Sequence, residues 1–258
     1  MINKKYLKLV RSRQRFDQNN FIYEIIAKRV IDSLDLLNIQ FGRALEIGVN
    51  ENIIYNYLIN KFEHINIERA DILFDNKNIK NVDNYLNIDL DDMLFSINNY
   101  DLIYSNTILH LTNNFEKNLI SILNSLKSNG FFIAVIPDKN NGFQLINSMY
   151  ETDMHLYKGV FQRVNQTVEV DNILPILKKL NFYAPSIHSD NFSINYSIFK
   201  NLLKDVRNTK LSYCHFDKKP NFENKKYFEK LESIYKKKYF DNNFELDIRV
   251  NIISGWKK

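Results

Sequence analysis

The most informative part of the sequence is Ala44-Leu45-Glu46-Ile47-Gly48-Val49-Asn50-Glu51-Asn52, in which an apolar run reaches an acid and then a glycine. Nucleotide-binding α/β proteins carry a glycine-rich turn at this point, between the first strand of the sheet and the helix that follows it. Such a turn needs several glycines, because the backbone approaches the ligand closely and adopts positive φ angles. Here only Gly48 is kept, and Asn50 and Asn52 stand where further glycines are expected. The sequence therefore predicts a ligand loop of this type with an altered tip.

Strands and helices are expected to alternate on both sides of this stretch. The predicted strands are Arg43–Ile47, Ile65–Ala70, Tyr85–Ile88, Tyr100–Ser105 and Phe131–Ile136, and the predicted helices are Asn20–Asn38, Ile53–Lys61 and Phe115–Lys127. This alternation indicates a parallel sheet covered by helices on both faces. Gly130 is expected to end the helix before the fifth strand, as a left-handed cap.

The last third of the chain has a different pattern. Helices are expected at Asn172–Leu180, Ser197–Val206 and Asn224–Lys236, around an extended region at Tyr183–Tyr196. Apolar and polar residues alternate strictly from Phe244 to Ile252, which is typical of a strand with one covered face and suggests an antiparallel addition to the sheet. The predicted organisation is an N-terminal helical segment over residues 1–40 and an α/β domain over residues 41–258, with helical insertions in its C-terminal third.

Composition limits the classes of function. The chain has 258 residues, 45% of them hydrophobic, which permits one large domain with a substantial core. The net charge of +5 is mild, and basic residues are interleaved with acidic ones along the chain. The denser basic stretches, Lys4–Arg15 and Lys236–Lys238, are each expected to form a solvated helix face. We therefore expect no nucleic-acid partner.

Cys214 is the only cysteine, which excludes a disulfide within the chain and a multi-cysteine zinc site. This favours a reducing compartment, and a cytoplasmic location is predicted. No apolar run reaches the length of a membrane span, and the basic N-terminus lacks the apolar core of a secretory signal. A mitochondrial presequence is conceivable because the first acid is Asp17, but the next helix is expected to begin almost at once.

Three acids are expected to meet at the carboxyl edge of the sheet, where ligands of open α/β sheets bind. Glu46 lies at the end of the first strand, and Asp71 and Asp89 end the second and third. An acid after the second strand can accept both hydroxyls of a ribose, and one near the third strand can accept from an adenine amino group. The acid in the first strand can orient the loop amides. Each acid alone could simply begin a loop, but the three in this order favour a binding site.

His110 follows the fourth strand, on the side from which a substrate would approach a ligand held at this edge. It is the one catalytic candidate, since a histidine here can shape a pocket or move a proton, although a structural histidine is an equal alternative. Tyr104, Asn106 and Asn113 are further pocket candidates. The remaining histidines lack the spacing of metal ligands, so no metal site is predicted.

The order and spacing of these motifs resemble the class I methyltransferase-fold family that includes the mitochondrial complex I assembly factor acting as an arginine hydroxylase and its alphaproteobacterial relatives. The chain is more distantly similar to the malonyl-carrier-protein O-methyltransferase of biotin synthesis. The stretches that carry the resemblance are Leu9 to Asp17, Phe41 to Gly48, Ala70-Asp71-Ile72, Asp89 to Phe95, Tyr100 to Ile103, Leu109-His110, Leu126 to Gly130 and Ser254 to Lys257.

This resemblance implies a Rossmann-like sheet of seven strands, mostly parallel with a reversed last strand, and S-adenosylmethionine as the cofactor. The family's cofactor residues correspond to Glu46, Gly48, Asp71 and Asp89. In this chain Asn50 and Asn52 replace the second and third loop glycines, and Glu51 adds a negative charge near the ligand's carboxylate. Asparagine tolerates left-handed backbone better than most residues, but the added side chains and charge are expected to weaken cofactor binding.

Three functions stay open at this point. The first is an S-adenosylmethionine-dependent methyltransferase with an altered loop. The second is a protein resembling the arginine hydroxylase, acting on a respiratory-complex subunit or another protein substrate. The third is a non-enzymatic assembly factor for respiratory complex I that keeps the fold and the partner. The lost glycines favour the third over the first, whereas the retained acids favour the first two.

Overall fold

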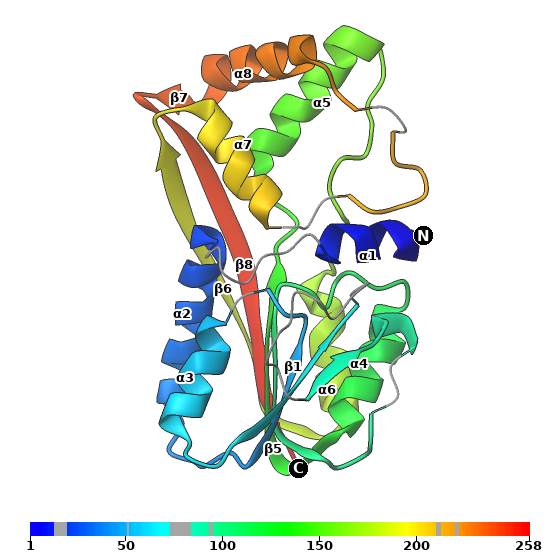
Figure 1. Cartoon of the computed structure of the whole chain (residues 1–258), viewed down its shortest axis with the longest axis vertical. Coiled ribbons are helices and arrows are strands. Elements are labelled where there is room, and N and C mark those ends of the chain that lie inside the picture. Colours follow the sequence, from blue (N-terminus) through cyan, green and yellow to red (C-terminus); the bar gives the residue numbers. More distant parts are fainter. Residues whose placement is uncertain (13–19, 51, 73–83, 93–94, 210–212, 220–221) are drawn as a thin grey trace.

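In the computed structural model, one mixed sheet forms the centre of the molecule and helices cover both of its faces (Figure 1). The structure describes residues 1–12, 20–50, 52–72, 84–92, 95–209, 213–219 and 222–258. The seven main strands are β1 (Arg43–Ile47), β2 (Asn66–Asp71), β3 (Tyr85–Asn87), β4 (Tyr100–Asn106), β5 (Leu126–Pro137), β6 (Phe182–Tyr196) and β8 (Asn243–Lys257). The helices are α1 (Lys4–Ser12), α2 (Phe21–Asp35), α3 (Ile53–Lys61), α4 (Phe115–Asn124), α5 (Phe143–Tyr157), α6 (Ile173–Lys179), α7 (Phe199–Asn208) and α8 (Lys225–Tyr239).

The strand order is β3-β2-β1-β4-β5-β8-β6, and the two-residue strand β7 (Phe240–Asp241) pairs with β8 beside this path. Neighbours from β3 to β5 are parallel, whereas β8 is antiparallel to both β5 and β6. Thus β8 is the one reversed strand on this path. The predicted parallel sheet with a reversed last strand is confirmed.

Two apolar clusters hold the layers together. Leu102 and Ile103 are adjacent in β4, and their side chains enter different clusters because successive residues of a strand point to opposite faces. One cluster includes α2 and α3, and the other includes α4 and α6, which lie on opposite sides of the sheet in Figure 1. The continuous burial of β1 and β4 therefore reflects a sheet covered on both faces.

Asparagine side chains begin three of the helices. Asn20, Asn114 and Asn224 each accept a hydrogen bond from a backbone N–H of the first helical turn, in α2, α4 and α8 respectively. These N–H groups have no partner within the helix, so the caps stabilise the helix starts. The predicted starts of these three helices agree with the structure to within one residue.

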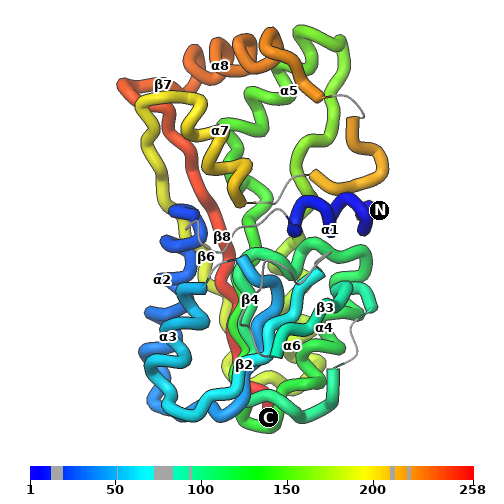
Figure 2. The backbone as a smooth tube through the Cα atoms, in the orientation of Figure 1, coloured from blue at the N-terminus to red at the C-terminus, as the bar shows by residue number. Residues whose placement is uncertain are grey.

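The long strands β6 and β8 continue past the carboxyl edge of the parallel strands and reach α5, α7 and α8, as the tube in Figure 2 also shows. The alternating residues of β8 pack there: Phe244 lies 5.2 Å from the ring of Phe199 in α7, and Leu246 is buried in the same cluster as Leu231 of α8. We call α5, α7 and α8 the helical lobe. The predicted alternation of buried and more exposed residues is confirmed over Phe244–Val250, but Asn251 is buried too, where β8 lies between β5 and β6.

Two expectations for the middle of the chain are wrong. Helix α4 ends at Asn124, three residues before the predicted end, and the left-handed residue that follows is Asn129, with φ 62°, and not Gly130. A Cβ at Gly130 would lie 2.7 Å from Cγ of Leu126, so close packing and not φ requires glycine there. Helix α5 was not expected at all.

None of the helices in the described part of the chain combines the length and the apolar character that a membrane span requires.

Candidate functional site

The loop after β1 has the sharp start that the sequence predicts. Gly48 adopts φ 79°, in the left-handed region that favours glycine, and its N–H donates to the carbonyl oxygen of Ala70 at 2.8 Å. A Cβ on Gly48 would also collide with the side chain of Ile108. Neither Asn50 nor Asn52 has a positive φ, so the asparagines do not reproduce a glycine-like backbone. Glu51 lies outside the described residues.

The carboxylate of Asp71 is fully engaged by groups of this chain. Arg11 of α1, which is 1% exposed, donates to Asp71 from Nη2 and from Nε, the latter at 3.3 Å. The backbone N–H groups of Val49 and Ile72 donate to the same carboxylate at 2.8 Å and 2.6 Å. Burial lowers the pKa of Arg11, but the neighbouring charge of Asp71 outweighs it and the net shift is upward. The expectation that Lys4–Arg15 forms a solvated face is wrong at Arg11.

Asn50 joins α1 to the end of β4. Its Oδ1 accepts from Nη1 of Arg11 at 2.5 Å, and its Nδ2 donates to the carbonyl oxygen of Asn106 and to Oγ1 of Thr107, the latter at 3.2 Å. The side chain is buried. A residue that replaces a loop glycine thus takes part in the same hydrogen-bond network as the acid after β2.

Glu46 forms a second buried ion pair, with Arg69 of β2. Nη1 of Arg69 also donates to Oδ1 of Asn52 at 2.8 Å, and its guanidinium lies 4.5 Å from the ring centroid of Tyr55. Burial raises the pKa of the Glu46 carboxyl above its usual range, and the charge of Arg69 opposes that shift. Both asparagines of the loop therefore accept from an arginine that is paired with a predicted cofactor acid.

Asp89, after β3, is paired with Lys4 of α1 at 2.6 Å, and the same ammonium group contacts Asp91. Asp91 also accepts from the backbone N–H of Asn113 at 2.9 Å. Burial tends to raise the pKa of Asp91, but hydrogen bonds from Lys4 and Thr112 lower it by more. The net shift of the pKa is downward, so the carboxyl group stays ionised. Helix α1 thus brings a cation to the acids that follow both β2 and β3.

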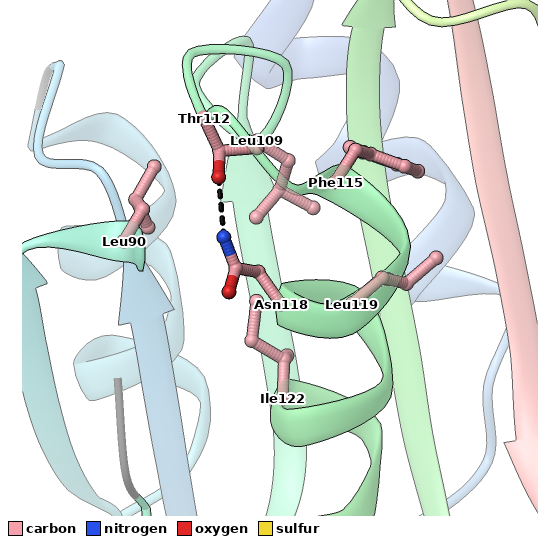
Figure 3. A pocket seen from close by; sticks show the side chains of 7 residues that line it. All are labelled: Leu90, Leu109, Thr112, Phe115, Asn118, Leu119 and Ile122. Carbon is pink, nitrogen blue, oxygen red and sulfur yellow. Dashed lines mark hydrogen bonds between the residues drawn. The ribbon is translucent and has the colours of Figure 1, made fainter. Parts of the chain in front are cut away.

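A small cavity lies beside the segment that follows β3 (Figure 3). Its volume is about 10 Å³, which is room for roughly one water molecule. It lies between Leu90 on one side and Leu109 and α4 on the other, and a hydrogen bond from Asn118 to Thr112 lies along it. A planar ring does not fit into this cavity as the side chains stand.

A much larger cleft, of about 1380 Å³, opens between the carboxyl ends of β4 and β5 and the helical lobe. Thr107 and His110 line it on the side of the sheet, and Tyr227 and Phe228 of α8 line it on the side of the lobe. None of the four predicted cofactor residues lines it. The predicted site thus has two adjoining parts: the acids and Gly48 lie outside the cleft and His110 lies in it, while Thr107, which lines the cleft, accepts from Nδ2 of Asn50 in the loop.

His110 is 7% exposed, and burial lowers its pKa to about 4. Its ring is therefore neutral at pH 7 and a weak base. Among the residues that the structure describes, its Nδ1 has no hydrogen-bond partner. These properties suit a residue that shapes the cleft better than one that accepts a proton.

Sequence reasoning missed the charged cluster on the wall of the cleft. Arg163 pairs with the fully buried Asp153 of α5 and, at 2.7 Å, with Glu223, and its guanidinium lies 4.6 Å from the ring centroid of Tyr227. Lys219 pairs with Glu223 at 2.9 Å. These residues come from a helix that was not expected and from two loops, so no periodic pattern points to them.

Of the further pocket candidates, Tyr104 and Asn106 are buried at β4, and Asn113 donates to Asp91. No cluster of three potential metal ligands occurs within the described ranges, and the absence of a metal site stays a prediction.

Comparison with known proteins gives the same picture of the fold. No family model matches the chain. It is 23% identical over 262 residues to a Dictyostelium discoideum protein named arginine-hydroxylase NDUFAF5, mitochondrial, covering 92% of this chain and 60% of that protein. The human protein of the same name is 21% identical, with 92% of this chain and 70% of that protein covered. A malonyl-[acyl-carrier protein] O-methyltransferase 2 of Ilyobacter polytropus is 26% identical over 84% of each chain.

Solved structures with the same fold include proteins described as methyltransferases. A Bacillus halodurans protein described as a putative methyltransferase superposes with a TM-score of 0.56 at 12% identity, covering 90% of this chain and 98% of that one. A Haemonchus contortus phosphoethanolamine N-methyltransferase 2, solved with S-adenosyl-L-methionine, gives 0.52 at 17% identity and covers 97% and 60%. The chain thus has the class I methyltransferase fold, and in sequence it is similar over most of its length to the proteins named NDUFAF5 arginine-hydroxylase.

Proposed function

We propose that this chain is an S-adenosylmethionine-dependent methyltransferase-like protein with an altered cofactor loop. The observation that carries the proposal is that Glu46, Gly48 and Asp71 meet at the carboxyl edge of the sheet, where this fold binds its ligands. Asp71 would hold the ribose hydroxyls, Glu46 and Gly48 would shape the loop, and Asp89 would lie on the adenine side. These carboxylates suit the hydroxyl and amino groups of the cofactor, on condition that Arg11 and Lys4 release Asp71 and Asp89.

The acceptor belongs in the large cleft. Its volume of about 1380 Å³ exceeds the roughly 300–1,000 Å³ of pockets that hold small molecules. It therefore has room for an extended segment, and we infer that the acceptor is a protein. When bound, the cofactor supplies an electrophilic methyl group. The chain's own part is to bind and orient the acceptor, because proximity alone lowers the barrier of such a transfer. Neutral His110 would position the acceptor at the sheet side of the cleft.

A second candidate is an arginine-hydroxylase-like protein or a non-enzymatic assembly factor for respiratory complex I, with a respiratory-complex subunit as the partner. Two observations favour it: the similarity to proteins named NDUFAF5 over 92% of the chain, and the fact that all three strand-end acids are already ion-paired. The single cysteine supports a reducing compartment, and we propose the cytoplasm on that ground.

Thermal unfolding with and without S-adenosylmethionine tests the proposed cofactor. Ligand at 100 times its Kd stabilises a protein by about 2.7 kcal/mol, which raises Tm. We expect millimolar cofactor to raise the Tm of the wild type and to leave that of Asp71→Ala unchanged. The exposed Asp171→Ala serves as the matched control and should shift like the wild type. An equal shift in wild type and Asp71→Ala would place the ligand elsewhere, and no shift in any protein would leave the second candidate.

A further inference from the structure

We propose that helix α1 is a displaceable occupant of the cofactor site, so that docking of α1 and binding of S-adenosylmethionine exclude each other. This inference rests on the proposed function, because it concerns the same strand-end acids. It adds a regulatory contact: the free protein closes its own site, and whatever draws α1 away opens it.

Asp71 cannot bind α1 and a ribose at the same time, because its acceptor positions are all in use. A carboxylate has about four acceptor positions, and in Asp71 four donors use them: Nε and Nη2 of Arg11 and the backbone N–H groups of Val49 and Ile72. Two of the four come from α1. No acceptor position is left for the two hydroxyls of a ribose, so the sugar and Arg11 cannot hold Asp71 at the same time.

The position of α1 also places it over both parts of the proposed cofactor site. The helix lies across the carboxyl edge of the sheet, between the parallel strands and the helical lobe (Figure 1). Its two inward cations, Lys4 and Arg11, are seven residues apart, which is about two helical turns. They pair with the acids after β3 and β2, which are neighbouring strands. One helix therefore covers both the ribose position and the adenine position of the proposed site.

The altered loop also binds α1 directly, because Asn50 is hydrogen-bonded to Arg11. Asn50 stands in the place of a loop glycine, and its Oδ1 accepts from Nη1 of Arg11 at 2.5 Å. Nη2 of Arg11 also donates to the carbonyl oxygen of Val49 at 3.1 Å. A glycine at position 50 could make no such side-chain contact. The loop thus recognises the guanidinium in the position where it would otherwise approach the cofactor.

Apart from the ion pairs of Lys4 and Arg11, α1 and the residues before it are held by apolar contacts and by backbone hydrogen bonds. Leu7 is 3% exposed and belongs to the apolar cluster around α4 and α6, and the N–H of Asn3 donates to the carbonyl oxygen of Cys214 at 2.7 Å. A single nine-residue helix that packs on the edge of a sheet opens at a lower free energy than the sheet beneath it. The apparent Kd of the cofactor equals its intrinsic Kd divided by the fraction of molecules in which α1 is released.

Calorimetric titration with S-adenosylmethionine tests the competition without a change in any charged residue. Leu7→Ala weakens the docking of α1, so we expect its Kd to be at least fivefold lower than that of the wild type. Leu9→Ala is the matched control, because Leu9 lies on the same helix but is 41% exposed. Its Kd should equal that of the wild type.

The single cysteine provides a second measurement. Cys214 is fully buried in the same cluster as Leu7 and is hydrogen-bonded through its backbone to Asn3. Saturating S-adenosylmethionine should therefore raise the rate at which a thiol reagent labels Cys214 in the folded wild type, by threefold or more. Leu7→Ala should be labelled faster than Leu9→Ala even without the cofactor.

The outcomes separate the two proposals. Equal Kd values for wild type, Leu7→Ala and Leu9→Ala would overturn the competition and leave the cofactor site standing, and slower labelling of Cys214 with cofactor would do the same. If S-adenosylmethionine bound to none of the three proteins, Leu7→Ala included, both the cofactor site and the competition would be overturned. Tighter binding and faster labelling in Leu7→Ala alone would support both.

Discussion

Arg11 and Asp71 are the two residues on which the carboxyl edge depends, since each would be a buried charge without the other. Their side chains are 1% and 2% exposed. Removing one partner of a buried ion pair costs roughly 3–5 kcal/mol, because the remaining charge loses both water and its counter-ion. A ligand that replaces Arg11 must therefore donate hydrogen bonds to Asp71, as the hydroxyls of a ribose can.

The buried ring of His110 should make the free energy of unfolding depend on pH. Its pKa is about 4 in the folded state because of burial, whereas an unfolded histidine has a pKa of about 6.5. The unfolded state therefore binds the extra proton first, and stability is lost as the pH falls from about 6.5 towards 4. We expect wild type to lose about 2 kcal/mol through this group between pH 7 and pH 5.

Urea unfolding at the two pH values checks this expectation. His110→Asn should remove that part of the loss, and the exposed His155→Asn should retain it. A pH dependence that is the same in His110→Asn and wild type would show that His110 is not buried as a neutral ring.

At the scale of the element, the loop after β1 and helix α1 form one unit. The side chain of Asn50 links them, with hydrogen bonds to Arg11, to the carbonyl oxygen of Asn106 and to Thr107. Strand β1 and Gly48 set the direction of the loop, while α1 fills the space beside it. The loop therefore has to be considered together with a helix about 40 residues earlier in the chain.

Asn50→Gly separates these two effects. It removes three buried hydrogen bonds, each worth about 0.5–1.5 kcal/mol, so the free energy of unfolding should fall. It also releases Arg11 and clears space in the loop, so the Kd for S-adenosylmethionine should fall severalfold in calorimetric titration. Asn181→Gly is a suitable control, because Asn181 has φ 59°, where glycine is tolerated. A Kd that is unchanged in Asn50→Gly would contradict the steric and competitive roles of this side chain.

At the scale of the whole molecule, β6 and β8 tie the helical lobe to the parallel sheet. Both strands have 15 residues and extend from the amino edge of the parallel strands, past their carboxyl edge, to α7 and α8. The apolar cluster that contains α2 and α3 also contains residues of α7 and α8. Because this core is continuous, the lobe has no separate interior of its own.

We therefore expect the molecule to unfold in one cooperative transition. The single tryptophan, Trp256, lies 4.5 Å from the ring of Phe131 in the lower sheet, and its fluorescence reports on that end. Hydrogen-exchange mass spectrometry of peptides from Lys225–Tyr239 reports on the lobe. The two midpoints in urea should coincide. An earlier transition for the lobe would show that it opens independently and that the cleft is not rigid.

Much of the fold could be predicted because its signals are local. The periodicities of 3.6 and 2 residues depend only on neighbours along the chain, and they located α2 and the antiparallel β8. Helix α5 escaped prediction. The predicted end of α4 is wrong because the helix stops four residues before Ser128-Asn129-Gly130, at a point that carries no glycine or proline.

In the candidate site, the positions of the acids could be predicted from the sequence, but their contacts could not. The positions of Glu46, Gly48, Asp71 and Asp89 at one edge follow from their places in the chain, because strand ends in a parallel sheet share that edge. The partners of those acids depend on packing between distant segments: Arg11 is 60 residues from Asp71 in sequence, and a buried charge is stable only beside a partner, which the fold supplies. The same packing placed His110 in the cleft and the acids outside it, because distance along the chain carries no information about which side chain fills a given space.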